Sequence, residues 1–490
     1  MMQTTRRAVL KRTIILTLLA MTTCAAAQDK PAAKPEPRVL RAGAAASNIT
    51  PFLGGDVVGG FHPYPAQHIH DELYAKCLVL DNGESRVAFV VLDLLGADRM
   101  MFDEARKLVT AATGLPGECL IMSTTHTHSA VSALGANRYL PQRGLDEYQQ
   151  FVARRIADGV RRAINQLEPA QVGWAKASEP REVFNRRWFM KPGTVPVNPF
   201  GEVDKVKMNP PRASQDLVEP AGPTDPDVWV LAARTPDGRP IGLLANYSLH
   251  YVGGVRGADV SADYYAYFAD RLQHLLGADR QQPPFVAAMS NGTSGNINNI
   301  DFKKPGESKK PYERMAEVAD NVAQAALKAY QSIQWHDQLP LGGRLERFDV
   351  AVRRPTEEQL ARAREILRKK PTTEGYKATL EEIYAERTVK LNEWPEKIGL
   401  PIQAIRVGEL AVGGIPNEVF VEIGLDYKQR SPLKPCFIMS MANGYYGYLP
   451  TPEHHRLGGY ETWLGTNRLE PDASNKILDK LITLTKELAP

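Results

Sequence analysis

Two histidines that lie two residues apart in the sequence could together hold a metal ion. They are His126 and His128, and they follow the apolar segment 119–124, which predicts a short buried strand. Residues i and i+2 of a strand share one face, so both imidazoles are predicted to point into one pocket. Imidazole nitrogens are good ligands for zinc. Taken alone, the pair is equally compatible with two partly buried histidines that serve only the structure.

Further polar residues stand at the ends of apolar segments, where functional sites often form. His250 follows segment 243–249, and Glu418 follows segment 412–417. Each of these two residues, taken alone, is also compatible with a plain role, as a capping histidine or as a charge at a loop end. The polar, glycine-containing loop 290–299 could direct backbone N–H groups at a developing oxyanion, or it could be a simple turn.

Phenols and arginines in predicted loops are weaker candidates for the same site. Segment 445–448 contains three tyrosines, and Tyr460 lies in a second loop close to the C-terminus. Arg186 and its neighbour Arg187 could clamp a substrate. Ring stacking for the tyrosines and a solvated position for the arginines explain these residues equally simply.

The elements that must position these residues are a mixture of strands and helices. Asn82 and Gly83, between two β-branched segments, predict a hairpin. The predicted strands are 73–80, 86–95, 119–124, 227–233, 241–249, 402–407, 409–414 and 437–441. The predicted helices are 103–113, 148–167, 263–276, 312–333, 356–370, 379–386 and 475–488. This pattern predicts a mixed α/β (α+β) fold with one large catalytic domain over residues 41–488.

The N-terminus has the order of an export signal. A basic stretch, 6–12, precedes the apolar run 13–21, and the alanines at 25–27 form a cleavage site, so residues 1–27 are predicted to be a signal peptide. The two adjacent arginines also resemble a twin-arginine signal, which leaves two export routes open. The apolar run is too short to span a bilayer. We therefore expect an exported, periplasmic or secreted protein with no transmembrane segment after signal removal, and a proline-rich linker over 28–40.

Composition and charge exclude several classes of protein. The 490 residues are 43% hydrophobic and 24% charged, as in soluble globular proteins. The formal net charge is +4, and four cations without a single carboxylate lie in the first 27 residues, so the rest of the chain is neutral. Neutrality gives no electrostatic basis for binding nucleic acid or an anionic membrane. Cys77, Cys119 and Cys436 are too far apart in the sequence to suggest a disulfide framework or a CxxC zinc site.

A series of short motifs resembles the neutral (alkaline, non-lysosomal) ceramidase family. Residues 125–129 match the first half of that family's THTHSGPGG, and residues 246–250 (NYSLH) resemble its N-W-x-x-H. Residues 416–418 resemble its P-G-E, and residues 445–451 resemble its Y-x-x-Y-V-T-T. The remaining similarities, in the family's order, are at 41–51, 185–186, 261–263 and 460–461. Each motif is short, but the motifs follow the family's order along the chain from about residue 41 to residue 465.

The resemblance implies a zinc site at the strand ends and a role for each candidate residue. By this resemblance His126, His250, Glu418 and Tyr448 are the zinc ligands. Arg186 and Tyr460 lie beside the scissile group, and His128 lies close to the metal as a candidate for proton transfer. The implied activity is zinc-dependent cleavage of an N-acyl amide bond, in ceramide or in another lipid or small-molecule amide.

Two departures from the family change what is expected. Asn298 stands where the family has a serine at the reacting carbon, and an amide side chain is not a nucleophile. We therefore expect zinc-activated water to attack, with Asn298 donating a hydrogen bond to the oxyanion. The second departure is length, since 30 residues follow Tyr460 and the family's C-terminal immunoglobulin-like domain is expected to be lacking. Alternatives are an ester or lactone hydrolase on the same metal, or a non-catalytic binding protein that lost the serine.

Overall fold

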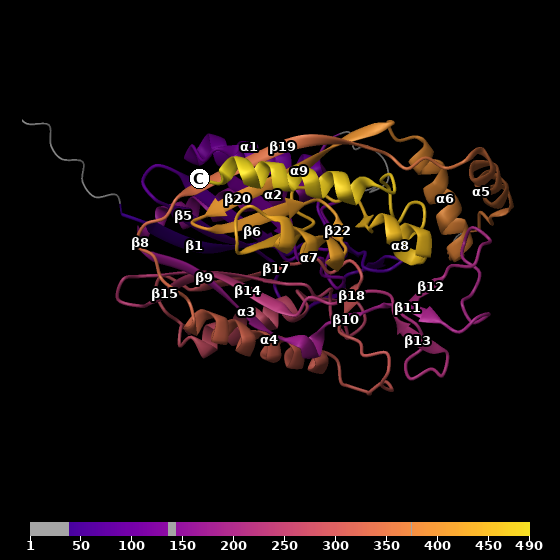
Figure 1. The fold of residues 1–490 in the computed structure, drawn as a ribbon, viewed down its shortest axis with the longest axis horizontal. Coiled ribbons are helices and arrows are strands. Elements are labelled where there is room, and N and C mark those ends of the chain that lie inside the picture. Colours follow the sequence, from indigo (N-terminus) through magenta and orange to yellow (C-terminus); the bar gives the residue numbers. More distant parts are fainter. Residues whose placement is uncertain (1–38, 136–143, 374) are drawn as a thin grey trace, which may run out of the picture. The chain divides into compact units, whose positions relative to one another are not determined.

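The structure is a computed structural model, and it describes residues 39–135, 144–373 and 375–490. The predicted signal peptide, 1–27, and nearly all of the predicted linker lie outside these residues. Within them the chain forms the mixed α/β fold that the sequence predicts, with strands between layers of helices (Figure 1). Among the described helices, none combines the length and the hydropathy needed to cross a membrane.

The first sheet delivers the histidine pair. It has the order β7-β6-β5-β1-β8, and the predicted hairpin at Asn82 and Gly83 joins β5 to β6. Helix α1 connects β6 to the parallel strand β7, and His126 follows β7 directly. The elements are β1 (Arg41–Asn48), β5 (Tyr74–Asp81), β6 (Arg86–Leu92), α1 (Arg99–Thr113), β7 (Leu120–Thr124), α2 (Glu147–Asn165) and β8 (Glu168–Pro169).

The second sheet delivers His250. Its order is β17-β15-β14-β9, and the crossover from β15 to the parallel strand β17 contains α3. Helices α3 and α4 cover this sheet on the side away from α9 (Figure 1). The elements are β9 (Gln171–Ser178), β14 (Asp227–Arg234), β15 (Pro240–Tyr247), α3 (Tyr264–Leu275), β17 (Val286–Asn291) and α4 (Glu313–Gln331).

The third sheet delivers Glu418 and the tyrosine loop. Its order is β19-β20-β21-β23, with β21 parallel to β23, and α9 packs across β19 and β20 (Figure 1). Glu418 follows β21, and segment 445–448 follows β23. The elements are β19 (Leu341–Ala351), β20 (Lys397–Val407), β21 (Leu410–Ile415), α7 (Val421–Arg430), β23 (Cys436–Ser440) and α9 (Ala473–Leu488).

Short strands and peripheral helices complete the fold around these sheets. Strands β7, β17 and β23 contact one another, which brings the carboxyl ends of three parallel strand pairs together. Crevices at such carboxyl ends are the usual ligand sites of α/β proteins. The remaining elements are β2 (Asp56–Val57), β3 (Tyr64–Pro65), β4 (His68–Ile69), β10 (Phe184–Asn185), β11 (Arg187–Met190), β12 (Val206–Met208), β13 (Leu217–Pro220), β16 (Asp259–Val260), β18 (Ile297–Asn298), α5 (Glu357–Lys369), α6 (Leu380–Asn392), β22 (Glu418–Val419), β24 (Tyr448–Leu449) and α8 (Pro452–Leu457).

The predicted strands and helices are present, with shifted ends. Strands β1 and β9 were not predicted, because alanine and glycine dominate β1 and the alternation in β9 is weak. Gly43 in β1 is required by packing, since a Cβ there would lie 2.1 Å from the carbonyl oxygen of Ala163 in α2. Helix α1 begins at Arg99 rather than 103, because the side chain of Asp98 accepts a hydrogen bond from the amide of Met100.

The three cysteines of the described residues are free and buried, and for Cys77 and Cys119 the apolar segments around them favour this. Burial raises the pKa of the Cys77 thiol to about 12 and the pKa of the Cys119 and Cys436 thiols to about 11. Such thiols stay protonated at neutral pH, and a protonated thiol is a poor nucleophile and a poor metal ligand. The cysteines therefore belong to the packed core and not to the chemistry.

Candidate metal centre

His126 and His128 converge by a different backbone route from the one the sequence predicts. Strand β7 ends at Thr124, and His126 lies in the left-handed region with φ 64°, which is uncommon for a residue with a Cβ. The expectation that the pair shares a strand face is therefore wrong. The turn still brings the two rings together, at 85° with centroids 4.8 Å apart. Backbone strain of this kind is typical of functional sites.

Backbone carbonyls fix the orientation of two imidazoles. Nδ1 of His126 lies 2.7 Å from the carbonyl oxygen of Leu95, and Nδ1 of His250 lies 3.2 Å from that of Ser294. A carbonyl oxygen only accepts hydrogen bonds, so each Nδ1 carries a hydrogen, and in a neutral ring the Nε2 atom then carries the lone pair. Histidine ligands of metals are oriented in this way by the hydrogen bond at the other ring nitrogen.

The Nε2 atoms of these imidazoles face a carboxylate. Oε2 of Glu418 lies 3.1 Å from Nε2 of His126 and 3.6 Å from Nε2 of His250, and all three side chains are buried. Acceptors that face one another at such distances repel unless a proton or a cation lies between them. Nε2 of His250 and Oε2 of Glu418 are also buried atoms without a hydrogen-bond partner, which is rare in folded proteins.

These donors fit a zinc ion. The ligand nitrogens of His126, His128 and His250 lie within 4.8 Å of one another, and Nε2 of His126 is 3.2 Å from Nε2 of His128. Two nitrogens at ~2.0–2.1 Å from one tetrahedral ion would lie about 3.3–3.4 Å apart. Imidazole nitrogens with a carboxylate oxygen are the donor set of catalytic zinc sites.

Burial and mutual charge keep the donors in the ligand form. Burial lowers the pKa of His128 and of His250 well below the usual range, and each is lowered further by neighbouring cationic groups. Burial alone would raise the pKa of Glu418, but His126, His250 and a hydrogen bond from Tyr445 bring it well below its usual range. At neutral pH His128 and His250 are therefore neutral imidazoles beside an ionised carboxylate.

Arg186 lies beside this cluster in a fully buried ion pair. Its Nε lies 3.0 Å from Oε1 of Glu461, while Nη1 of Arg187 lies 2.6 Å from Oε2 of the same carboxylate. Nη2 of Arg186 donates to the hydroxyl of Tyr448 at 3.0 Å and to the carbonyl of Gly295 at 2.8 Å. Glu461 thus holds Arg186 rigidly against Tyr448.

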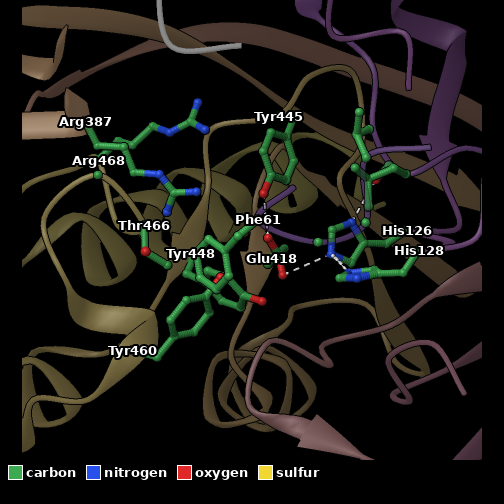
Figure 2. Close-up of a pocket in the computed structure, with 15 residues that line it drawn as sticks. Phe61, His126, His128, Arg387, Glu418, Tyr445, Tyr448, Tyr460, Thr466 and Arg468 are labelled. Atoms are coloured by element: carbon green, nitrogen blue, oxygen red, sulfur yellow. Dashed lines mark hydrogen bonds and ion pairs between the residues drawn. The ribbon is translucent and has the colours of Figure 1, made fainter. Parts of the chain in front are cut away.

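Two adjoining cavities open onto the cluster. The larger has a volume of about 460 Å³ and the smaller about 90 Å³, and His128, Tyr448 and Tyr460 line both. Figure 2 shows Tyr448 and Tyr460 on one side of Glu418 and the two histidines on the other. The rings of Tyr448 and Tyr460 meet edge to face, with centroids 5.8 Å apart. The structure therefore brings Arg186, Tyr448 and Tyr460 to the walls around the histidine cluster.

Comparison with solved structures decides the fold. The crystal structure of neutral ceramidase from Pseudomonas aeruginosa superposes with a TM-score of 0.67 at 18% identity, over 92% of this chain and 74% of that one. A structure described as ceramidase complexed with C2 gives 0.68 at 17% identity, over 92% and 76% of the two chains. The chain has the neutral ceramidase fold. No family model matches the sequence.

The similarity that the motifs predict is thus confirmed for the fold, and the motif residues can be located within it. His126, His250 and Glu418 of the implied ligand set converge, and His128 lies as close to them as they lie to one another. Tyr448 lines both cavities, and its hydroxyl accepts from Arg186. The individual roles of these residues stay predictions.

Asn298, the departure from the neutral ceramidase motif, lies in β18 and pairs with Phe184 of β10. Its amide nitrogen donates to Oδ1 of Asn209 at 2.9 Å, and Asn209 lines the larger cavity. Asn298 itself is buried behind Asn209. Its proposed contact with the oxyanion stays a prediction, and the contact in the structure is one that positions Asn209.

Of two further aromatic residues at the site, Tyr445 belongs to the tyrosine segment that the sequence analysis selected, and Tyr251 escaped that analysis. The hydroxyl of Tyr445 donates to Oε1 of Glu418 at 2.7 Å, so Tyr445 orients the carboxylate from the same loop as Tyr448 (Figure 2). The ring of Tyr251 stacks on His128 with centroids 3.8 Å apart. The position of Tyr251 directly after His250 was the available signal, because the chain that carries a ligand also carries its neighbour into the site.

Proposed function

We propose that this protein is an exported zinc-dependent hydrolase that cleaves an N-acyl amide bond. The observation that carries the proposal is the meeting of two buried imidazole Nε2 atoms with the carboxylate of Glu418, at 3.1 and 3.6 Å, where Nε2 of His250 and Oε2 of Glu418 have no hydrogen-bond partner. The neutral ceramidase fold supports an amide as the scissile group, because the similar solved structures are ceramidases by name. The leader at 1–27 supports export.

Each buried group has a defined task in this proposal. His126, His250 and Glu418 hold the ion, and Tyr445 holds the carboxylate in place. A bound zinc ion supplies an activated water near pH 7 and polarises the amide carbonyl. We assign to His128 the transfer of a proton to the leaving amine, and its stacking on Tyr251 and its 3.2 Å contact with His126 support this role.

The cation beside the cluster acts on the charge that develops during the reaction. Arg186 keeps its positive charge in the buried site because Glu461 pairs with it, and this guanidinium also holds the hydroxyl of Tyr448. A fixed cation in a water-poor site stabilises a developing oxyanion without reorganisation. Tyr460, packed edge to face on Tyr448, closes the wall between the two cavities.

Metal analysis with a hydrolysis assay tests the proposal. We expect about one zinc per chain in the purified protein, chelator-sensitive turnover of N-acyl amides, and loss of both in His126→Ala and His250→Ala. The matched control is His274→Ala, because His274 is an exposed histidine on α3 paired only with Asp279. Stoichiometric zinc in both site variants would refute the ligand assignment.

Substrate pairs separate the proposed amidase from its alternatives. An N-octanoyl amide and the matching O-octanoyl ester are assayed with the zinc-loaded protein. Hydrolysis of the ester alone would replace the amidase by an esterase on the same metal. A zinc-loaded protein that turns over neither compound, nor other N-acyl and O-acyl pairs, would point to a binding protein.

A further inference from the structure

Two arginines line the small cavity beside the candidate metal centre, and the proposed chemistry does not use them. Arg387 comes from α6 and Arg468 from the segment before α9, and their exposed fractions are 7% and 3%. The only carboxylate among the described residues that line this cavity is Glu418, which belongs to the metal centre. The wall of the small cavity therefore carries two guanidinium charges in a confined space.

Aromatic rings and a glycine hold the two guanidinium groups. Cζ of Arg387 lies 5.4 Å from the ring centroid of Phe61, and Cζ of Arg468 lies 5.4 Å from that of Tyr445. Gly465 makes room for the stem of Arg387, since a Cβ there would lie 2.8 Å from its Cβ. Both side chains extend from the same side toward Tyr445 and Phe61 in Figure 2. Guanidinium groups held against aromatic rings are well suited to bind a planar anion.

The pair lies one tyrosine ring from the metal centre. The face of Tyr445 carries Arg468, while its hydroxyl donates to Oε1 of Glu418 at 2.7 Å. An anion bound by the arginines would therefore lie close to a scissile group at the histidine cluster. A carboxylate fits this position, because arginine forms short, bidentate, charge-assisted hydrogen bonds with it.

The larger of the two adjoining cavities has a different lining. It is about five times larger, at about 460 Å³ against about 90 Å³, and Val195, Pro196, Val197 and Leu380 line its outer part. Val197 is 65% exposed and Leu380 is 40% exposed, so the apolar lining continues to the surface. The site thus offers a large cavity with apolar residues toward the surface next to a small cavity with two guanidinium groups. The wall of the large cavity also contains the charged side chains of Arg186, Asp204 and Lys207.

We propose that the substrate is an N-acyl amino acid, whose carboxylate is bound by Arg387 and Arg468 and whose acyl chain lies in the larger cavity. This rests on the proposed amide hydrolysis. Water adds its hydroxyl to the acyl carbon, the C–N bond breaks, and the amine takes the second hydrogen, so that a fatty acid and an amino acid leave. The carboxylate of an α-amino acid is two bonds from the scissile nitrogen, which suits the short distance between the arginines and the cluster.

Three matched substrates test this assignment on the zinc-loaded protein. N-octanoyl-L-alanine carries the carboxylate, and N-octanoyl-L-alaninamide replaces it with a neutral amide of similar shape. N-glutarylpropylamine carries a carboxylate on the acyl side instead. We expect kcat/KM for the first compound to exceed that for the second by about 10- to 100-fold, the effect of hydrogen bonds to a charged group. Equal rates, or a preference for the third compound, would overturn the proposal.

Arginine variants show whether the pair causes the preference. In Arg387→Met and Arg468→Met the ratio of kcat/KM for acid over amide should fall about tenfold or more, and Arg387→Lys should keep part of it. Arg364→Met is the matched control, since Arg364 is an exposed arginine on α5 outside this cavity. A ratio unchanged in both Met variants refutes the assignment. Thermal unfolding and zinc analysis identify a variant that is merely misfolded. In that case the ratio measured for the Arg→Lys variant at the same position replaces that of the Met variant in the test.

A binding measurement separates failure of this inference from failure of the proposed function. Calorimetry of N-octanoyl-L-alanine and its alaninamide analogue with chelator-treated protein reports the arginine pair without metal or turnover. Tighter binding of the acid, lost in Arg468→Met, supports the anion site even if no amide is hydrolysed. Amide hydrolysis together with equal binding of both compounds would support the hydrolase proposal and refute the assignment of an N-acyl amino acid as the substrate.

Discussion

Glu418 and Tyr448 are direct partners across the two-residue parallel pair of β22 and β24. Paired residues of neighbouring strands project their side chains to the same side. Two residues thirty positions apart in the sequence therefore stand next to each other at the wall of the same cavity. This pairing gives the motif similarity a structural basis, because it couples the carboxylate of one motif to the phenol of the next.

The fourth zinc ligand can be identified from metal affinity. The motif similarity assigns Tyr448, while the structure brings the ligand nitrogens of His128, His126 and His250 within 4.8 Å of one another. We expect Tyr448→Phe to lower zinc affinity by more than about 100-fold and His128→Gln by about 10- to 100-fold, as for residues around a metal site. Competition with a chromogenic chelator measures both, with Tyr446→Phe as the control. The reverse order would make His128 the ligand.

Glu461 should be essential for the stability of the site. It balances Arg186 and Arg187 in a fully buried position, so Glu461→Gln leaves two buried cations without their counter-ion. Breaking such a pair costs about 3–5 kcal/mol in the free energy of unfolding, which urea denaturation measures. The control is Glu487→Gln, at a half-exposed pair with Arg344, for which we expect a change of about 0–1 kcal/mol. Equal effects of the two substitutions would contradict the role of Glu461 as the counter-ion of the two arginines.

Asn298→Ala distinguishes attack by water from attack by the protein. Because Asn298 positions Asn209 through a 2.9 Å hydrogen bond, its loss should slow turnover about tenfold without abolishing it. Mass spectrometry during turnover should show no acyl group on the chain. An acylated serine would overturn direct attack by water and make that serine the nucleophile.

His455 predicts a loss of stability in acid. Burial, with Arg353 and Arg187 nearby, lowers the pKa of His455 to about 3. Below pH 6.5 the unfolded chain takes up a proton that the folded chain does not, so stability falls with falling pH, until the folded form also protonates near pH 3. Between pH 6.5 and 5 we expect the free energy of unfolding to fall by about 2 kcal/mol less in His455→Gln than in the wild-type protein.

Chemical denaturation at the two pH values, with zinc present throughout, measures this difference. The exposed His274→Gln serves as the control, because it is paired only with Asp279 at the surface. A wild-type protein and a His455→Gln variant that lose stability in parallel would show that His455 is not responsible.

The sequence by itself determined the strands and helices whose patterns are strong, and with them the residues at strand ends. Segments such as 86–95 and 437–441 consist mostly of apolar residues, so local propensity and burial agree there. The order of motifs from 41 to 465 also identified the fold, because short motifs in a fixed order are improbable by chance. His126, His250, Glu418 and Arg186 were all selected on these grounds.

Only the tertiary structure decided which of these side chains meet, and how. The Nε2 atoms of His126 and His250 face Glu418 because the carbonyls of Leu95 and Ser294, remote in sequence from the histidines they hold, accept hydrogen bonds from the Nδ1 atoms. The arginine pair depends on α6 and the segment before α9 meeting at one cavity wall. Contacts of this kind follow from how whole sheets pack together, and local sequence patterns report on the neighbours along the chain rather than on those across the core.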